Sequence, residues 1–301
     1  MRDKLPILLL LVTALHAQSD ALARGLQAFS AGRFGEAELH LRQAVSADPR
    51  SFEARLALGA ALAELRRPEE AIAQLTEAHR LRPGHPDAFK LLATQLMAAR
   101  QYAKAVTLLS SSANFDEETM LLLIESHQAS GDSANSFALA QKAAIRFPNS
   151  APVKCWLGFQ LQFAGRYDEA RRYLEESLRL APDYPATYTI LAGVLLKQGK
   201  PRDAIPYFQK AIAVAPDDAD AHIGLSRAVD ETGDLAQALD TLRKGIAAIP
   251  REARLHLQLS RLCFRMGDEA CAEKEADISL RLREPNTTGG ELPSALRTSN
   301  D

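Results

Sequence analysis

Aromatic side chains are scarce in this sequence of 301 residues: they make up 6% of it, and Trp156 is the only tryptophan. Neither sign of charge is in excess, because 36 basic and 38 acidic residues leave a formal net charge of -2. Such a balance gives no argument for nucleic acid or an anionic membrane as a partner, and we expect no nucleic-acid partner. The chain is 47% hydrophobic and 25% charged, which suits a folded protein with ample core.

Motifs that carry chemistry are also missing. The sequence has no HExxH, GxSxG, GxGxxG or P-loop pattern. Several acidic pairs, such as Glu69-Glu70, lie near expected helix starts, where the helix dipole favours negative charge. His222 and His256 are 34 residues apart and are best explained as residues of a helix surface or of the packing between helices. We therefore expect no enzyme, no cofactor and no metal.

Long apolar runs are absent except at the start of the chain. Two basic residues precede the run at 5–14, a pattern typical of a secretory signal peptide over residues 1–17. Cleavage after Ala17 is the first choice and after Ala23 the second. The run is shorter than the roughly 20 apolar residues that span a membrane, and no cysteine precedes Cys155, which excludes a lipoprotein anchor. We expect an exported protein, periplasmic or secreted, without a transmembrane helix in its mature form.

What the sequence does contain is a period of 34 residues. Alanine, glycine and proline each recur with it, at Ala170, Ala204, Ala238 and Ala272, at Gly131, Gly165, Gly199, Gly233 and Gly267, and at Pro148, Pro182, Pro216 and Pro250. The glycine suits a tight turn between two helices, the alanine allows the second helix close to the first, and the proline ends the second helix. Between these marks apolar residues recur at spacings of three and four. Each unit is therefore predicted to be a helical hairpin.

These units resemble tetratricopeptide repeats. In one unit the matching residues are Leu157, Gly158, Leu161, Gly165, Tyr167, Ala170, Leu174 and Pro182. The resemblance implies an all-α fold, a right-handed α-solenoid of about eight 34-residue helix–turn–helix repeats. The units are 18–51, 52–85, 86–116, 117–150, 151–184, 185–218, 219–252 and 253–286. The remaining tail, 287–301, has no helical pattern and is predicted to be disordered.

The third unit, 86–116, is three residues short and lacks the closing proline. A shortened second helix should loosen the array there. We expect a joint just before Asp116, with the first three units and the last five as semi-independent stacks.

Two of the three cysteines flank the last turn glycine symmetrically. Cys263 lies four residues before Gly267, and Cys271 four residues after it. In an antiparallel hairpin these positions lie at similar height, so either a disulfide formed after export or two separate thiols would fit. Cys155 has no evident partner and suits a small apolar filler.

The family resemblance implies that the first helix of each unit lines the inner face of the superhelix. Helical spacing puts Trp156, Phe159 and Phe163 opposite the face that closes their own hairpin. These rings are predicted to be anchors in a binding groove, with Leu122 and Ile190 as extensions. The alternative is that adjacent repeats cover them.

Basic residues mark the far end of the same predicted groove. Arg254, Arg261 and Arg265 form one helix stripe in the last unit. They would bind a carboxylate or an acidic segment, or simply be solvated.

Two functions remain open on these grounds. The leading hypothesis is a non-catalytic scaffold or adaptor of the periplasm or cell envelope, which binds an extended peptide or a helix of a protein partner in its concave groove. The alternative is a regulatory or structural subunit of a cell-envelope enzyme or of an assembly or secretion complex.

Overall fold

The computed structural model describes residues 20–112 and 115–283. The predicted signal peptide (1–17) and the predicted disordered tail (287–301) lie outside the described residues. Every regular element in the described ranges is a helix. The all-α, helix–turn–helix fold predicted from the 34-residue period is confirmed.

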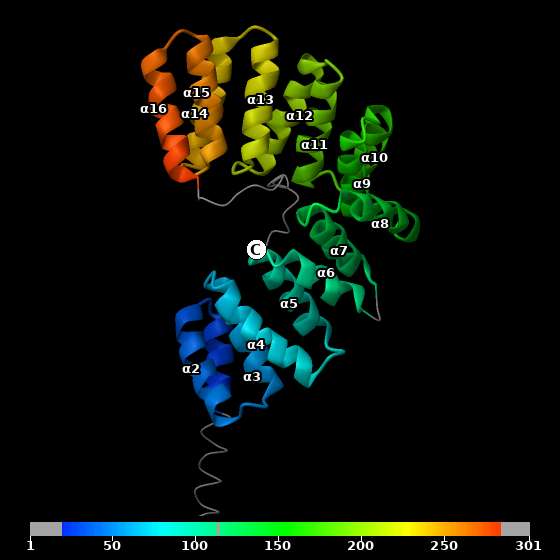
Figure 1. The fold of residues 1–301 in the computed structure, drawn as a ribbon, viewed down its shortest axis with the longest axis vertical. Helices are drawn as coiled ribbons and strands as arrows, with labels where there is room; N and C mark the ends of the chain where they lie inside the picture. Colours follow the sequence, from blue (N-terminus) through cyan, green and yellow to red (C-terminus); the bar gives the residue numbers. More distant parts are fainter. Residues whose placement is uncertain (1–19, 113–114, 284–301) are drawn as a thin grey trace, which may run out of the picture. The chain divides into compact units, whose positions relative to one another are not determined.

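The chain divides into two compact units, Met1–Ser130 and Gly131–Asp301. In the first unit a helical segment at 20–30 is followed by α2 (Phe34–Ala47), α3 (Phe52–Glu64), α4 (Pro68–Leu81), α5 (Pro86–Ala98), α6 (Tyr102–Ser110) and α7 (Glu117–Ala129) (Figure 1). The second unit holds α8 (Ser133–Arg146), α9 (Ala151–Phe163), α10 (Tyr167–Leu180), α11 (Pro185–Lys197), α12 (Pro201–Val214), α13 (Ala219–Glu231), α14 (Leu235–Ala248), α15 (Ala253–Arg265) and α16 (Glu269–Leu282).

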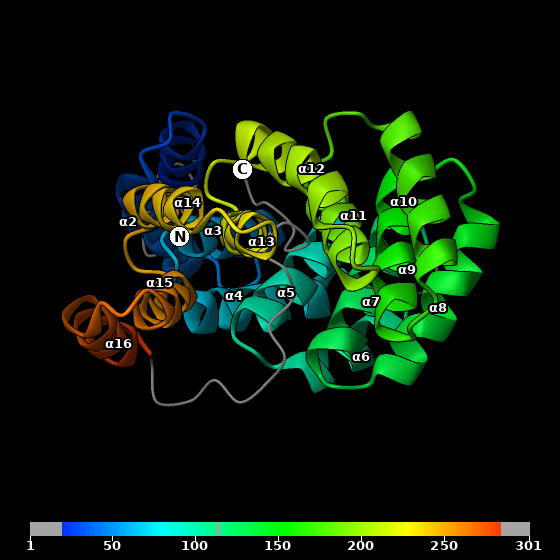
Figure 2. The same cartoon turned by 90° about the horizontal axis from the view of Figure 1, so that it is seen from above.

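Within each unit, consecutive helices pack as hairpins. Figures 1 and 2 show α15 beside α16 at one end of the second unit, and the two helices are in contact along their length. First helices of neighbouring repeats also touch: α9 contacts α11, α11 contacts α13, and α13 contacts α15. The first helices of the second unit therefore form one continuous layer.

The hairpin turns need a residue with a left-handed backbone. Gly165 supplies it between α9 and α10 with a φ of +72°, a region that glycine enters without steric cost. In the first unit the same turn position is taken by Arg66 and Arg100, each with a φ of +57°. The turn is thus kept even where the glycine of the sequence pattern is missing.

Close approach of the two helices explains a glycine and an alanine twelve residues apart, a spacing that recurs at Gly59 and Ala71 and at Gly158 and Ala170. A Cβ added to Gly158 would lie 2.6 Å from Leu174 Cγ and 3.2 Å from the Ala170 carbonyl oxygen. Ala170 and Leu174 are fully buried. The predicted contact between the second helix and Gly158 is present.

The shortened third repeat is visible as a short helix, since α6 has 9 residues where the other second helices have 14. The division of the chain nevertheless falls between Ser130 and Gly131, so the joint expected just before Asp116 was placed wrongly. The Lys90 ammonium pairs with the Asp116 carboxylate at 2.8 Å and also with Glu118. These ion pairs join α5 to the start of α7 and keep α7 in the first unit.

No helix among the described residues is both long and apolar enough to cross a membrane.

Candidate partner-binding surface

The three rings of α9 form a ladder in which only the last ring is open. Trp156 and Phe159 meet edge to face with ring centroids 5.5 Å apart, and Phe159 and Phe163 do so at 4.8 Å. Trp156 and Phe159 are each 3% exposed, whereas Phe163 is 68% exposed. Edge-to-face packing of this kind is favourable for aromatic pairs, so Phe159 holds the exposed ring of Phe163 in place.

The prediction that all of these rings are exposed anchors was wrong for Trp156 and Phe159, and equally for Leu122 and Ile190, which are each 3% exposed. The reason lies in the next repeats. Ile190 and Gly224 occupy the position of Trp156 at intervals of 34, and a Cβ on Gly224 would lie 2.2 Å from the ring of Phe208 in α12. That position therefore faces the preceding repeat and not an open surface.

Two of the three predicted arginines are already paired within the chain. Arg254 of α15 binds the Asp220 carboxylate of α13 at 2.8 Å and also Glu252. Arg265 binds Asp230, again across from α15 to α13. These bridges between first helices tie neighbouring repeats together.

Arg261 is different, because it is exposed and has no ion pair with any described residue. Arg227, at the same position one repeat earlier, shares both properties. The sequence signal that marks Arg227 is its place in the 34-residue register, one period before Arg261.

Five exposed residues of the first helices α9, α11, α13 and α15 form what we call the first-helix surface. Phe163, Lys197 and Glu231 share one position of the 34-residue register, which continues to the paired Arg265, and Arg227 and Arg261 share a second position four residues earlier. Arg227 and Glu231 lie four residues apart on α13, on one helix face. Three of the five side chains are cations and one is a carboxylate. The surface therefore has a net positive charge with an aromatic ring at one end.

The histidines in equivalent positions have a structural role. His222 Nε2 lies 2.9 Å from the carbonyl oxygen of Pro216, and His256 Nε2 lies 3.2 Å from that of Pro250. One repeat earlier, the Tyr188 hydroxyl donates to the Pro182 carbonyl at 2.7 Å. These bonds form a recurring latch, which we call the proline-carbonyl latch, between a first helix and the end of the preceding repeat.

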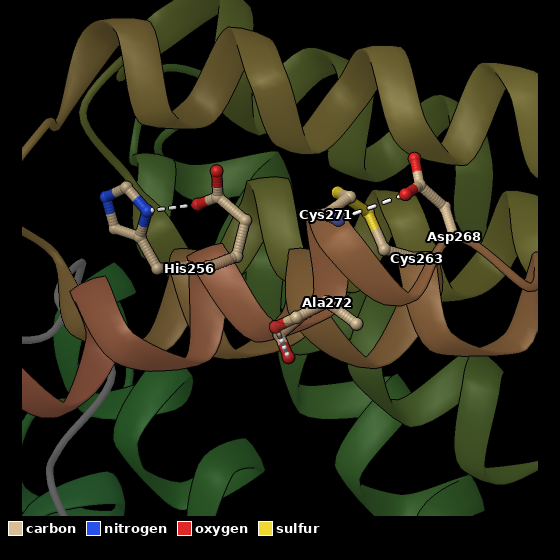
Figure 3. Close-up of a disulfide and its surroundings, with 7 residues drawn as sticks. His256, Cys263, Asp268, Cys271 and Ala272 are labelled. Atoms are coloured by element: carbon tan, nitrogen blue, oxygen red, sulfur yellow. Dashed lines mark hydrogen bonds and ion pairs between the residues drawn. A yellow bond between two sulfur atoms is a disulfide. The ribbon is translucent and has the colours of Figure 1, made fainter.

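The last hairpin is also held covalently. Cys263 of α15 and Cys271 of α16 form a disulfide with Cα atoms 5.8 Å apart, beside the turn that Asp268 caps (Figure 3). The Ser260 hydroxyl donates to the Ala272 carbonyl at 2.8 Å in the same hairpin. Both bonds join the first helix of the repeat to its second.

Cys155 is the free cysteine of the described part of the chain, and it is buried. Burial raises the pKa of its thiol to about 12, with a small opposing effect of Thr187. Since the thiolate is the reactive form of cysteine, this side chain is inert and fills space between helices. Among the described residues, no group of three or more His, Cys, Asp or Glu side chains is placed to hold a metal ion.

A layer of paired helices that recur every 34 residues, with a charged exposed face, defines a helical-repeat architecture. Tetratricopeptide repeat models match residues 22–86, 62–119, 149–217 and 195–262, which together span 22–119 and 149–262. The chain therefore belongs to the tetratricopeptide repeat family. Proteins of this family are typically non-catalytic and act through protein partners.

Solved structures agree on the fold. A tetratricopeptide repeat protein from Parabacteroides merdae ATCC 43184 is 14% identical with a TM-score of 0.71, over 83% of this chain and 99% of that one. A chain of the APC/C hetero-tetramer Cut9–Hcn1 is 18% identical with a TM-score of 0.65, over 91% of this chain. This chain spans 55% of the length of that relative. No curated protein sequence matches.

Proposed function

We propose that this chain is an exported, non-catalytic scaffold whose first-helix surface binds an extended acidic segment of a protein partner. The observation that carries the proposal is the pair of exposed arginines, Arg227 and Arg261, which occupy the same position in successive repeats without a carboxylate partner among the described residues. Arg254 and Arg265 are neutralised by Asp220 and Asp230. The free charge of this surface is therefore cationic.

The chemistry of these side chains favours carboxylates as ligands. A guanidinium binds a carboxylate through two parallel hydrogen bonds, which fixes orientation as well as adding energy. Phe163 adds an exposed ring that Phe159 supports from below, and aromatic side chains are favoured anchors of interfaces. A partner segment with acidic residues and one apolar residue complements both features.

An extended segment suits the arrangement of the helices. Neighbouring packed helices lie about 8–10 Å apart, and an extended chain rises about 3.3 Å per residue, so the partner would advance about three residues per repeat. A segment of roughly twelve residues would then cross the four first helices of the second unit.

The proposal of export is supported by the basic and apolar pattern of residues 1–17 and by the disulfide of the last hairpin, since disulfides persist in oxidising compartments. Cleavage after Ala17 suits the fold better than cleavage after Ala23. The second site would remove Ala21, which is 9% exposed and packs with Ala44 and Ala54.

Binding is tested with a fluorescein-labelled peptide of twelve residues, composed of Glu and Ser with one central Leu. We expect it to bind, and binding to weaken as salt rises, because exposed charges are screened. The double variant Arg227→Glu/Arg261→Glu should lose about tenfold or more in affinity, since exposed ion pairs contribute up to about 1 kcal/mol each.

The matched control is Arg202→Glu/Arg243→Glu, which makes the same change of charge at exposed arginines of α12 and α14. An equal loss in both double variants would reject the first-helix surface as the site. The site would also be rejected if a peptide with Lys in place of every Glu bound with the same affinity as the acidic peptide.

Export is tested separately by expressing the full chain in a Gram-negative host and sequencing the N-terminus of the purified protein. A start at Gln18 is expected. A protein that retains Met1 and stays with the cytoplasmic fraction would refute export and would leave the peptide-binding result standing.

A further inference from the structure

The second unit has a pocket on a different side of its helices, away from the first-helix surface. The pocket has a volume of about 440 Å³ and lies between α8, α9 and α10. Its floor is formed by Leu157 and Leu161 of α9, and α8 contributes Ala144 and Ile145. Pockets of this size are typical of ligand-binding sites in proteins.

The 34-residue register explains why a hollow exists here. Later second helices carry Leu178, Ile212 and Ile246 at the position of Ala144, and Ile212 and Ile246 pack against the core. The position of Lys154 is taken by Tyr188 in the next repeat. An alanine side chain leaves open the space that larger apolar side chains fill elsewhere in the array.

The rim of the pocket carries a large apolar side chain that is exposed to solvent. Ile145 is 83% exposed, whereas the equivalent positions in the next two repeats hold Arg179 and Ala213. An exposed β-branched residue on a helix adds little to the stability of the fold. A large exposed apolar side chain beside a hollow therefore indicates a surface that contacts another protein. A small molecule held inside the pocket would leave the Ile145 side chain on the rim exposed to water.

One of the three cations that line the pocket makes no close ion pair with a described residue. Lys154 pairs with Glu176 at 2.6 Å, and Arg166 pairs with Glu169 at 2.6 Å. Arg172 lines the same pocket and has no ion pair with any described residue. Its guanidinium carbon lies 5.1 Å from the centre of the Tyr173 ring, a contact that orients the cation.

We propose that this pocket is a second docking site, which binds a short segment of a protein partner that carries an apolar side chain next to a carboxylate. The apolar side chain enters the space above Leu157 and Leu161 and covers Ile145. The carboxylate pairs with Arg172. Three cations and two carboxylates line the pocket, so one negative charge from the partner balances the site.

The chemistry of the pocket is tested first with 1-anilinonaphthalene-8-sulfonate, a small probe that is both aromatic and anionic. Trp156, the only tryptophan, lies on α9, the helix that forms the pocket floor. Binding should therefore quench its fluorescence through energy transfer to the probe. We expect Arg172→Glu to weaken binding at least tenfold, and Arg243→Glu, an equal change of charge on α14, to leave it unchanged.

Protein docking is tested by selecting peptides from a random display library on the full chain. Enrichment of peptides in which a large apolar residue adjoins Asp, Glu or a C-terminal carboxylate is expected, with competition against the probe. Ile145→Ser should abolish that enrichment without affecting the melting temperature, since the side chain is exposed, whereas Leu39→Ser on the exposed face of α2 should change neither.

Three results would overturn the proposal: enriched peptides without an acidic group, enrichment that survives Arg172→Glu, or a probe that binds at this pocket while no selected peptide displaces it. The last result would mean a site for small anions only. Substitutions at Arg227 and Arg261 should have no effect on this pocket, so the outcome is independent of the proposed function of the first-helix surface.

Discussion

Replacing Gly224 by alanine should destabilise the protein, although alanine is the better helix former. In a helix interior the exchange gains about 1 kcal/mol from propensity alone. At Gly224, however, the added Cβ would lie 2.2 Å from both Cε1 and Cζ of Phe208. This is well inside the roughly 3.5–4.0 Å of a favourable carbon–carbon contact.

Phe208 is 2% exposed and is packed in the core of the second unit, so its ring cannot move aside freely. Overpacking of a core costs about 1–3 kcal/mol, and a contact this short calls for the upper part of that range. After the helix gain is subtracted, we expect a net loss of about 1–2 kcal/mol in the free energy of unfolding.

Gly193 provides the matched control, because it also lies inside a first helix. The nearest atom to a Cβ there is Gln162 Oε1 at 3.3 Å, at the end of a flexible side chain. Gly193→Ala should therefore stabilise the chain by about 0.5–1 kcal/mol.

Urea denaturation followed by far-ultraviolet circular dichroism measures the difference between the two variants. Adding Phe208→Leu to Gly224→Ala should recover part of the loss, since the contact is shared. If Gly224→Ala proves as stable as Gly193→Ala, α13 does not approach α12 as closely as described. The conclusion that the helix face of Gly224 packs on the preceding repeat would then be wrong.

Two further predictions concern the last hairpin and the start of α7. Cys263 and Cys271 are 8 residues apart, and a disulfide that closes so short a loop stabilises the folded state by about 2.5 kcal/mol. Reduction should therefore raise the rate of hydrogen exchange in α15 and α16 and leave the first unit unchanged. Exchange rates that do not respond to reductant would show that the disulfide does not stabilise this hairpin. Burial by itself would raise the pKa of Asp116, but hydrogen bonds from Lys90 and the following backbone lower it from 3.8 to about 2. Because the folded pKa lies below the unfolded one, this stabilisation is complete above about pH 4 and is lost as the pH falls through about 2. Asp116→Asn keeps a good helix N-cap and should remove that part of the acid dependence, and an unchanged acid titration of stability would contradict the assigned role.

The period of 34 was sufficient to predict the hairpins, because each mark in it has a local physical cause. A proline ends a helix and an alanine admits a close neighbour wherever they occur in the chain. The turns at Arg66 and Arg100 were harder to predict from the sequence, since arginine gives no local sign of a left-handed backbone. There the stacking of the helices imposes the turn and the side chain tolerates it.

The exposure of the candidate partner-binding residues was predicted less well, for a related reason. A helical wheel separates the face that closes a hairpin from the face opposite, but in a stacked array the opposite face is divided between open surface and the preceding repeat. Trp156 and Phe163 lie seven residues apart on the same helix side, yet one is buried and the other exposed. Only the contact of Gly224 with Phe208 shows where that division falls.

The proline-carbonyl latch is made by different side chains in neighbouring repeats. A phenol at Tyr188 and imidazoles at His222 and His256 each bond the proline carbonyl oxygen at the end of the preceding repeat. At His256 the ring also meets the Glu275 carboxylate through Nδ1 at 2.7 Å, so a tyrosine there would keep the latch and lose this second contact. Neighbouring repeats therefore differ in side chain at this position while the bond to the proline carbonyl is kept, and the imidazole adds a second ring nitrogen with which the last repeat ties α15 to α16.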